Sequence, residues 1–224
     1  MKGYSESRRA VYFWEQGRKD SINDSVFKLL PFVFYTLDSL YDITRKLPNR
    51  EPTFDGEIPI IDAQRFFVLG LPEDEDYKNV RLTLALVSDL YFLLEGIKNQ
   101  GNLMEIESVI IKMNDESRKF SDIRNFFTHL DERISNLERH GIDGETITNC
   151  GIRYNSTAKN CFHLVVGKGE IHFSDSKEPK EIDIGKSAFN SIFIEARNLY
   201  ATLTDLNILN VKADFVSPDT LYPL

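Results

Sequence analysis

The sequence predicts a mainly α-helical fold, in which a small antiparallel β-meander is inserted before the last helix of a helical bundle. Two observations lead to this expectation. Apolar residues recur every three or four positions along several long segments of the first 140 residues, which is the period of a helix. Short alternating runs, separated by turn-rich stretches such as "STAKN" and "GKG", fill about residues 145–184, which is typical of short strands.

The predicted organisation is a single domain. The chain has 224 residues, 42% of them apolar and 28% charged, which is ordinary for a globular protein with one sizeable core. We expect one helical domain over residues 1–207, with the meander inserted at about 145–184 and a C-terminal tail at 208–224.

Several segments carry the helical pattern. Residues 24–47 and 79–99 are apolar almost all round and are therefore expected deep in the bundle, with Pro31 kinking the first of them or starting a new segment. Residues 48–59 contain three prolines and a glycine, so we expect a loop there. The last helix is expected at 186–206, packed back on the bundle.

The helix expected from Ser121, its predicted N-cap, carries the clearest apolar stripe. Its apolar positions step by three and four through about five turns, as in a helix packed in a bundle: Phe120, Ile123, Phe127, Leu130, Ile134 and Leu137. At about 100° per residue, a polar strip falls on the opposite side, with two arginines on its borders: Asn125, His129, Glu132 and Asn136, with Arg124 and Arg133. These side chains are expected to face outward.

The polar strip suits an anionic substrate. A guanidinium matches phosphate oxygens with two hydrogen bonds and stays charged, and an imidazole exchanges a proton near neutral pH. Arg124 would also lie near the helix N-terminus, where unpaired N–H groups and the helix dipole favour an anion. Together, Arg124 and His129 form a minimal set of groups for cleaving a phosphodiester.

The amino-acid composition argues against several classes of binding partner. The formal net charge of -8 argues against binding of duplex DNA. The longest apolar run, "VFKLLPFVFYTL", is too short to cross a bilayer and contains Lys28 and Pro31, so we expect no membrane partner. Residues 1–20 lack the apolar stretch of a secretory signal, and two cysteines are too few for a disulfide scaffold. These features predict a cytoplasmic protein with reduced thiols.

The segment "IRNFFTHLDERI" resembles the HEPN superfamily, whose signature is Arg, a polar residue that is commonly Asn, and then His after four to six positions on a late helix of an all-α bundle. Arg124, Asn125 and His129 match that signature, and "LDERI" resembles an extension found in some branches. The resemblance implies a metal-independent endoribonuclease that acts as a homodimer on RNA, as a toxin or a phage-defence effector, and needs no cofactor. It also raises the prospect of an antitoxin or another protein partner.

The resemblance assigns roles to the strip. His129 would take the 2′-hydroxyl proton or protonate the leaving 5′-oxygen, and its copy in the second protomer would do the other step. Arg124 would hold the phosphate, and Asn125 would orient the imidazole or the phosphate. Glu132 and Arg133 are supporting candidates, although ion pairing between residues four apart on a helix explains them equally well.

Other readings stay open. The strip could be the ordinary solvated face of a helix, and the chain could be a catalytically inactive HEPN-like bundle that serves as a protein-interaction or dimerisation module. The pair Arg197 and Asn198 shows that Arg-Asn can recur without a histidine behind it. His163 and His172 could bind a metal from neighbouring strands, but without a nearby cysteine or carboxylate at ligand spacing an exposed sheet face is the simpler interpretation, and no metal is expected.

Overall fold

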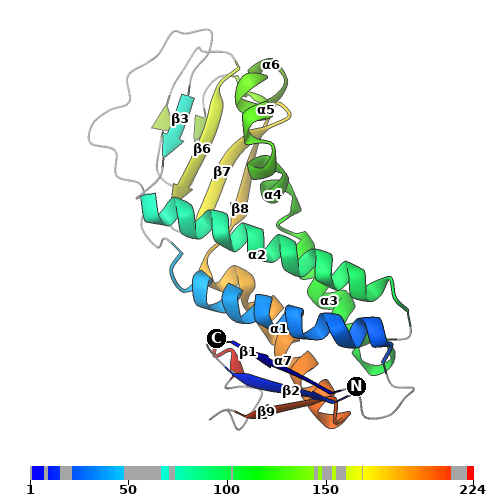
Figure 1. Cartoon of the computed structure of the whole chain (residues 1–224). Coiled ribbons are helices and arrows are strands. Elements are labelled where there is room, and N and C mark those ends of the chain that lie inside the picture. Colours follow the sequence, from blue (N-terminus) through cyan, green and yellow to red (C-terminus); the bar gives the residue numbers. More distant parts are fainter. Residues whose placement is uncertain are drawn as a thin grey trace. The chain divides into compact units, whose positions relative to one another are not determined.

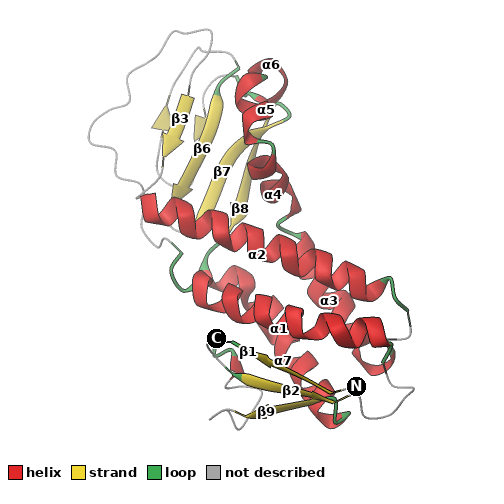
Figure 2. Cartoon of the chain, in the orientation of Figure 1, coloured by secondary structure: helices red, strands yellow, loops and turns green. Residues whose placement is uncertain are grey.

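The chain forms a mixed α/β structure. The computed structural model describes residues 2–7, 10–15, 22–47, 67–70, 74–101, 103–143, 146–147, 153–154, 160–167, 169–212 and 221–224 (Figure 1). Helices and strands occur throughout these ranges (Figure 2). The strands form three sheets, of three, four and two strands. The predicted fold class, a helical bundle with one small meander, is therefore wrong.

The contacts divide the chain into two compact units. Unit 1 contains Met1–Arg45, Thr83–Ser121 and Phe189–Leu224, and unit 2 contains Lys46–Leu82 and Asp122–Ala188. The predicted single domain of residues 1–207 crosses both units. Among the described residues, no helix combines the length and the apolar character that a membrane span requires.

Unit 1 joins a three-stranded sheet to helices. The sheet has the order β1-β2-β9 and is antiparallel throughout, with β1 at Lys2–Glu6, β2 at Val11–Glu15 and β9 at Leu209–Lys212. The helical elements are α1 (Asp24–Thr44), η1 (Met104–Ile106), α3 (Glu107–Arg118), α7 (Asn190–Asp205) and, from Thr83 onward, α2 (Asp74–Lys98). Helix α1 is continuous through Pro31 and is capped by Asn23, whose side chain accepts a hydrogen bond from the Ser25 N–H.

The sheet of unit 1 explains the first error in the predicted fold. In β2, Tyr12 and Trp14 are buried and Phe13 between them is exposed, which is the alternation of a strand with one covered face. Tyr12 and Trp14 pack against Phe34 of α1, with ring centroids 5.4 and 5.6 Å apart. Such short strands are stable only when paired, and the partner β9 lies in the segment expected as a tail.

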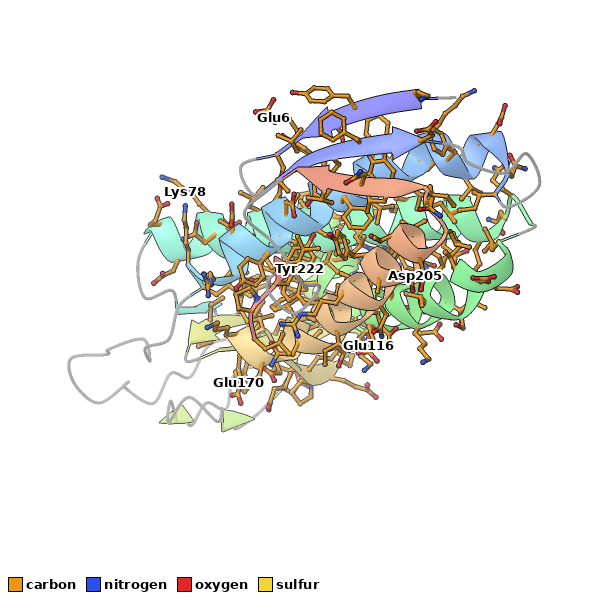
Figure 3. All side chains as sticks on the ribbon, turned by 90° about the horizontal axis from the view of Figure 1, so that it is seen from below. Glu6, Lys78, Glu116, Glu170, Asp205 and Tyr222 are labelled. Atoms are coloured by element: carbon orange, nitrogen blue, oxygen red, sulfur yellow. The ribbon has the colours of Figure 1, made fainter. Side chains whose placement is uncertain are left out.

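A buried carboxylate ties three parts of unit 1 together. Asp38 of α1 accepts hydrogen bonds from the hydroxyls of Tyr12 at 2.9 Å, Tyr222 at 2.8 Å and Ser7. Asp38 is 2% exposed and Tyr222, labelled in Figure 3, is fully buried. Burial and the charge of Asp38 raise the pKa of Tyr12, so its hydroxyl stays a donor at neutral pH. The N-terminal hairpin and the C-terminal segment are thus both bonded to α1.

Unit 2 is built on a four-stranded mixed sheet of order β3-β6-β7-β8. Its strands are β3 (Phe67–Gly70), β6 (Phe162–Gly167), β7 (Glu170–Asp175) and β8 (Glu178–Asp183). Strands β6, β7 and β8 are consecutive and antiparallel, whereas β3 pairs with β6 in parallel. The sheet is therefore not an isolated meander, because β3 comes from a segment about 90 residues earlier in the chain. The strands β4 (Thr146–Ile147) and β5 (Arg153–Tyr154) pair separately.

Short helices cover one face of the sheet of unit 2. They are α4 (Ser121–Thr128), α5 (Leu130–Ser135) and α6 (Leu137–His140), and η2 (Lys186–Phe189) follows the sheet. Phe126 of α4 contacts Phe162 of β6 and Phe173 of β7, with ring centroids 6.0 and 4.8 Å apart. Because side chains alternate along β7, Asp175 shares the face of Phe173 and points toward the helices.

Candidate functional site

The helix that carries the Arg-Asn-His signature breaks at the histidine. Helix α4 ends at Thr128 and α5 begins at Leu130, and His129 between them has φ -114° and ψ 34°. Its N–H still donates to the Asn125 carbonyl at 3.1 Å, and its own carbonyl accepts from the Arg133 N–H at 3.1 Å. The backbone therefore keeps Asn125, His129 and Arg133 one turn apart in spite of the break.

The apolar stripe does not continue through the break as predicted. Ile123 and Phe127 are buried, but α5 has no buried residue and Ile134 is 37% exposed. A change of backbone direction at His129 turns these later positions away from the core. Leu137 is buried again in α6.

The three predicted catalytic residues lie at the surface of unit 2. The Arg124 guanidinium donates through Nε and Nη2 to the Asn125 side-chain oxygen at 3.2 and 2.9 Å. Asn125 is exposed, Arg124 is half-buried and the His129 side chain is 57% exposed. The arrangement presents an imidazole one turn after an arginine-amide pair.

Beneath this surface lies a buried polar cluster around Asp175, the last residue of β7. Asp175 Oδ1 is 2.9 Å from His140 Nδ1 and 3.4 Å from Arg133 Nε, and Oδ2 is 3.8 Å from Lys180 Nζ. Asp175 is 7% exposed and His140 is 4% exposed. Arg133 therefore leaves the exposed strip, where it was expected, and pairs with a strand of the sheet.

The charge state of Asp175 follows from its neighbours. Burial raises its pKa, but the His140 hydrogen bond and the nearby charges of Arg133 and Lys180 outweigh burial and hold the pKa of Asp175 below its usual value. The carboxyl is therefore ionised at neutral pH and can only accept hydrogen bonds. It follows that Nδ1 of His140 carries the proton that it shares with Asp175.

Glu132 lies between the surface histidine and the buried one. Its Oε2 is 3.9 Å from His129 Nδ1, and its Oε1 is 3.9 Å from His140 Nε2 and 3.8 Å from Arg139 Nη1. The side chain of Glu132 is 47% exposed. The structure thus places two imidazoles at the two oxygens of one carboxylate.

Gly141 allows α6 to approach the sheet. Its neighbour Ile142 exchanges two backbone hydrogen bonds with Cys161, at 3.0 and 2.8 Å. Gly141 has φ -72° and ψ 160°, which any residue can adopt. A Cβ there would lie 2.6 Å from the Asn160 carbonyl carbon and 2.7 Å from the Leu137 carbonyl oxygen, so space and not backbone freedom requires glycine.

Replacing Gly141 by Ala is expected to destabilise the protein by roughly 1–3 kcal/mol, because the added methyl meets backbone atoms that cannot move independently. Urea unfolding of purified protein measures the change. Gly96→Ala in helix α2 is the matched control, since a Cβ there meets only Leu29 Cδ1 at 3.8 Å and should stabilise the helix by up to about 1 kcal/mol. Equal stability of both variants would contradict the role given to Gly141.

A second polar cluster lies on β7 and β8. His172 Nε2 is 3.1 Å from Glu170 Oε2, and His172 Nδ1 is 3.6 Å from Glu181 Oε2. One ligand atom from each of the three residues lies within 4.8 Å of the other two, so the cluster has a donor set that can hold a metal ion, with the carboxylates that the sequence did not place near a histidine. His172 is 6% exposed, which corrects the expected exposed sheet face; the side chain of His163 lies outside the described residues.

Sequence reasoning missed the part of the site that is buried. Neither His140 nor Asp175 was among the predicted site residues. The two residues are 35 positions apart and meet because a strand ends beside a short helix. No spacing along the chain signals such a pair.

Comparisons with protein-family models, with curated proteins and with solved structures found no match. The described fold and site define a mixed α/β protein with an exposed Arg-Asn-His surface backed by a buried Asp-His-Arg cluster.

Proposed function

We propose that the protein is a metal-independent endoribonuclease that acts as a homodimer in the cytoplasm, as a toxin or a phage-defence effector, with an antitoxin or another protein as a further partner. The observation that carries the proposal is the exposed His129 imidazole one turn after the paired Arg124 and Asn125 side chains. The proposal depends on this segment and not on the predicted bundle.

The chemistry proposed is an attack of the ribose 2′-oxygen on the adjacent phosphorus. The new 2′-O–P bond forms while the P–O5′ bond breaks, which leaves a 2′,3′-cyclic phosphate and a 5′-hydroxyl. One His129 takes the 2′-hydroxyl proton, and the His129 of the second protomer protonates the leaving 5′-oxygen. Arg124 stabilises the charge that develops on the phosphate, and Asn125 orients the guanidinium through its side-chain oxygen.

The net charge of -8 favours a second candidate function, because an acidic chain attracts RNA weakly beyond a local site. In that case the same surface belongs to a catalytically inactive module for protein interaction or dimerisation. The two candidates differ in whether the purified dimer cleaves RNA.

The test is His129→Ala, assayed for cleavage of varied RNAs and for 2′,3′-cyclic phosphate ends. We expect cleavage to fall by roughly 10²–10⁴-fold, the usual contribution of a general acid or base, without loss of fold because the side chain is exposed. Asn198→Ala should leave cleavage unchanged, since Asn198 follows Arg197 on α7 with no histidine behind it. Undiminished cleavage by His129→Ala would refute the mechanism, and a wild-type dimer that cleaves no RNA would favour the interaction module.

A further inference from the structure

We propose that Asp175, His140 and Glu132 form a positioning chain behind His129, which holds the His129 imidazole by its Nδ1 and presents its Nε2 to the substrate. This inference rests on the proposed function, because it assigns a role within the same site. All four residues belong to unit 2.

His140 cannot contact the substrate itself. Its side chain is 5% exposed, and its Nε2 is buried. The ring is fixed from the other side, because Nδ1 bonds the ionised Asp175 at 2.9 Å. Any effect of His140 on chemistry at the surface must therefore pass through another residue.

Glu132 is the residue that His140 faces. His140 Nε2 has no hydrogen-bond partner among the described residues, and Glu132 Oε1 lies 3.9 Å from it. A buried polar atom that makes no hydrogen bond destabilises the folded protein, so His140 Nε2 is expected to gain a hydrogen-bond partner. Glu132 Oε1, which also pairs with Arg139 Nη1 at 3.8 Å, can accept a hydrogen bond from Nε2 by a small movement of its half-exposed side chain. Because a carboxylate only accepts, this bond forms in the state in which the His140 ring carries a proton on both nitrogens, one toward each carboxylate.

The same carboxylate reaches the catalytic imidazole. Glu132 Oε2 lies 3.9 Å from His129 Nδ1, which is beyond hydrogen-bond distance, and catalytic groups that are too far apart in the free protein often close to a hydrogen bond when the substrate binds. A carboxylate at Nδ1 selects the form of the ring that carries a proton there. Nε2 of His129 is then the nitrogen that exchanges protons with the ribose or the leaving oxygen.

The break in the helix at His129 explains why a side-chain partner is needed to orient the His129 imidazole. In an unbroken helix, residues three apart lie on one face but their separation is fixed by the helix. Here His129 leaves helical geometry, with φ -114° and ψ 34°, and α5 restarts with Glu132 in its first turn. The orientation of the His129 ring is thus set by a side-chain partner as well as by its backbone.

The test uses Glu132→Gln, because this exposed position tolerates the change whereas Asp175 variants are expected to lose several kcal/mol of stability, which would confuse the kinetic comparison. Asp131→Asn removes the same charge at the neighbouring exposed position and is the matched control. We expect Glu132→Gln to lower kcat roughly 10- to 100-fold with KM changed less than about twofold, since the substrate contacts remain. Asp131→Asn should match the wild type in both.

A second measurement separates this inference from the proposed function. Nitrogen-15 spectra of the histidine rings report which ring nitrogen carries the proton, with or without RNA cleavage. We expect His129 to carry it on Nδ1 in the wild type and in Asp131→Asn, and to lose that preference in Glu132→Gln. If the preference is unchanged in Glu132→Gln, the positioning chain is refuted. If the preferred nitrogen of His129 changes in Glu132→Gln but neither the wild type nor any variant cleaves RNA, the positioning chain is supported and the nuclease proposal fails.

Discussion

Replacing Asp175 by Ala is expected to lower the free energy of unfolding at pH 7 by about 3–5 kcal/mol, the usual effect of removing one partner from a buried charged group. The change leaves Arg133, with a side chain 12% exposed, and His140 without the carboxylate that both approach. Urea unfolding measures the loss. Asp131→Ala at an exposed position should cost less than about 0.5 kcal/mol. A loss of under about 1 kcal/mol for Asp175→Ala would show that the cluster does not hold β7 to the helices.

The same site predicts a dependence on pH. The pKa of Asp175 is held below its ordinary value in the folded protein, in spite of burial, by His140, Arg133 and Lys180. A lowered carboxyl pKa contributes stability that is present above the unfolded value of about 3.9 and is lost as the pH falls through the folded value. The difference in free energy of unfolding between wild type and Asp175→Asn should therefore be largest at pH 6–7 and decrease below roughly pH 4. A difference that stayed constant in acid would assign the effect to packing instead of charge.

The sequence correctly predicted those features that depend on residues close to one another along the chain. The apolar residues at Phe27, Leu30, Phe34 and Leu37 lie on buried turns of α1, and such periodicity is visible because a helix brings residues three and four apart together. The polar surface at Asn125 and His129 was visible for the same reason. The backbone hydrogen bonds across the break at His129 also join residues four positions apart, His129 to Asn125 and Arg133 to His129.

The sequence could not predict the sheets and the buried ion pair, because these depend on residues that are far apart along the chain. Val11 in β2 pairs with Lys212 in β9, and Phe67 in β3 pairs with Phe162 in β6, so neither sheet follows from a local pattern. The burial of Arg133 has the same origin, because its partner Asp175 belongs to a strand that the helix meets only in the folded protein. A charged residue on the border of a helical stripe gives no local sign of such a partner.

The second large effect is expected at Asp38 in unit 1. Asp38→Ala should lower the free energy of unfolding by about 3–5 kcal/mol, since a buried hydroxyl left without an acceptor costs about 1–3 kcal/mol. Three hydroxyls lose their acceptor in this variant, those of Ser7, Tyr12 and Tyr222. Asp115→Ala on the exposed face of α3 is the matched control, with an expected change within about 0.5 kcal/mol.

A double-mutant cycle decides whether Asp38 acts through these hydroxyls. Tyr12→Phe alone removes one donor and should cost about 1 kcal/mol, but in the Asp38→Ala background the Tyr12 hydroxyl is already without its acceptor, so the same change should cost less or become favourable. We expect a coupling of roughly 0.5–3 kcal/mol between the two positions. Strictly additive losses would mean that the carboxylate stabilises α1 independently of the hairpin. Coupling would mean that Asp38 joins the N-terminal strands to α1 through the Tyr12 hydroxyl, a bond between residues 26 positions apart.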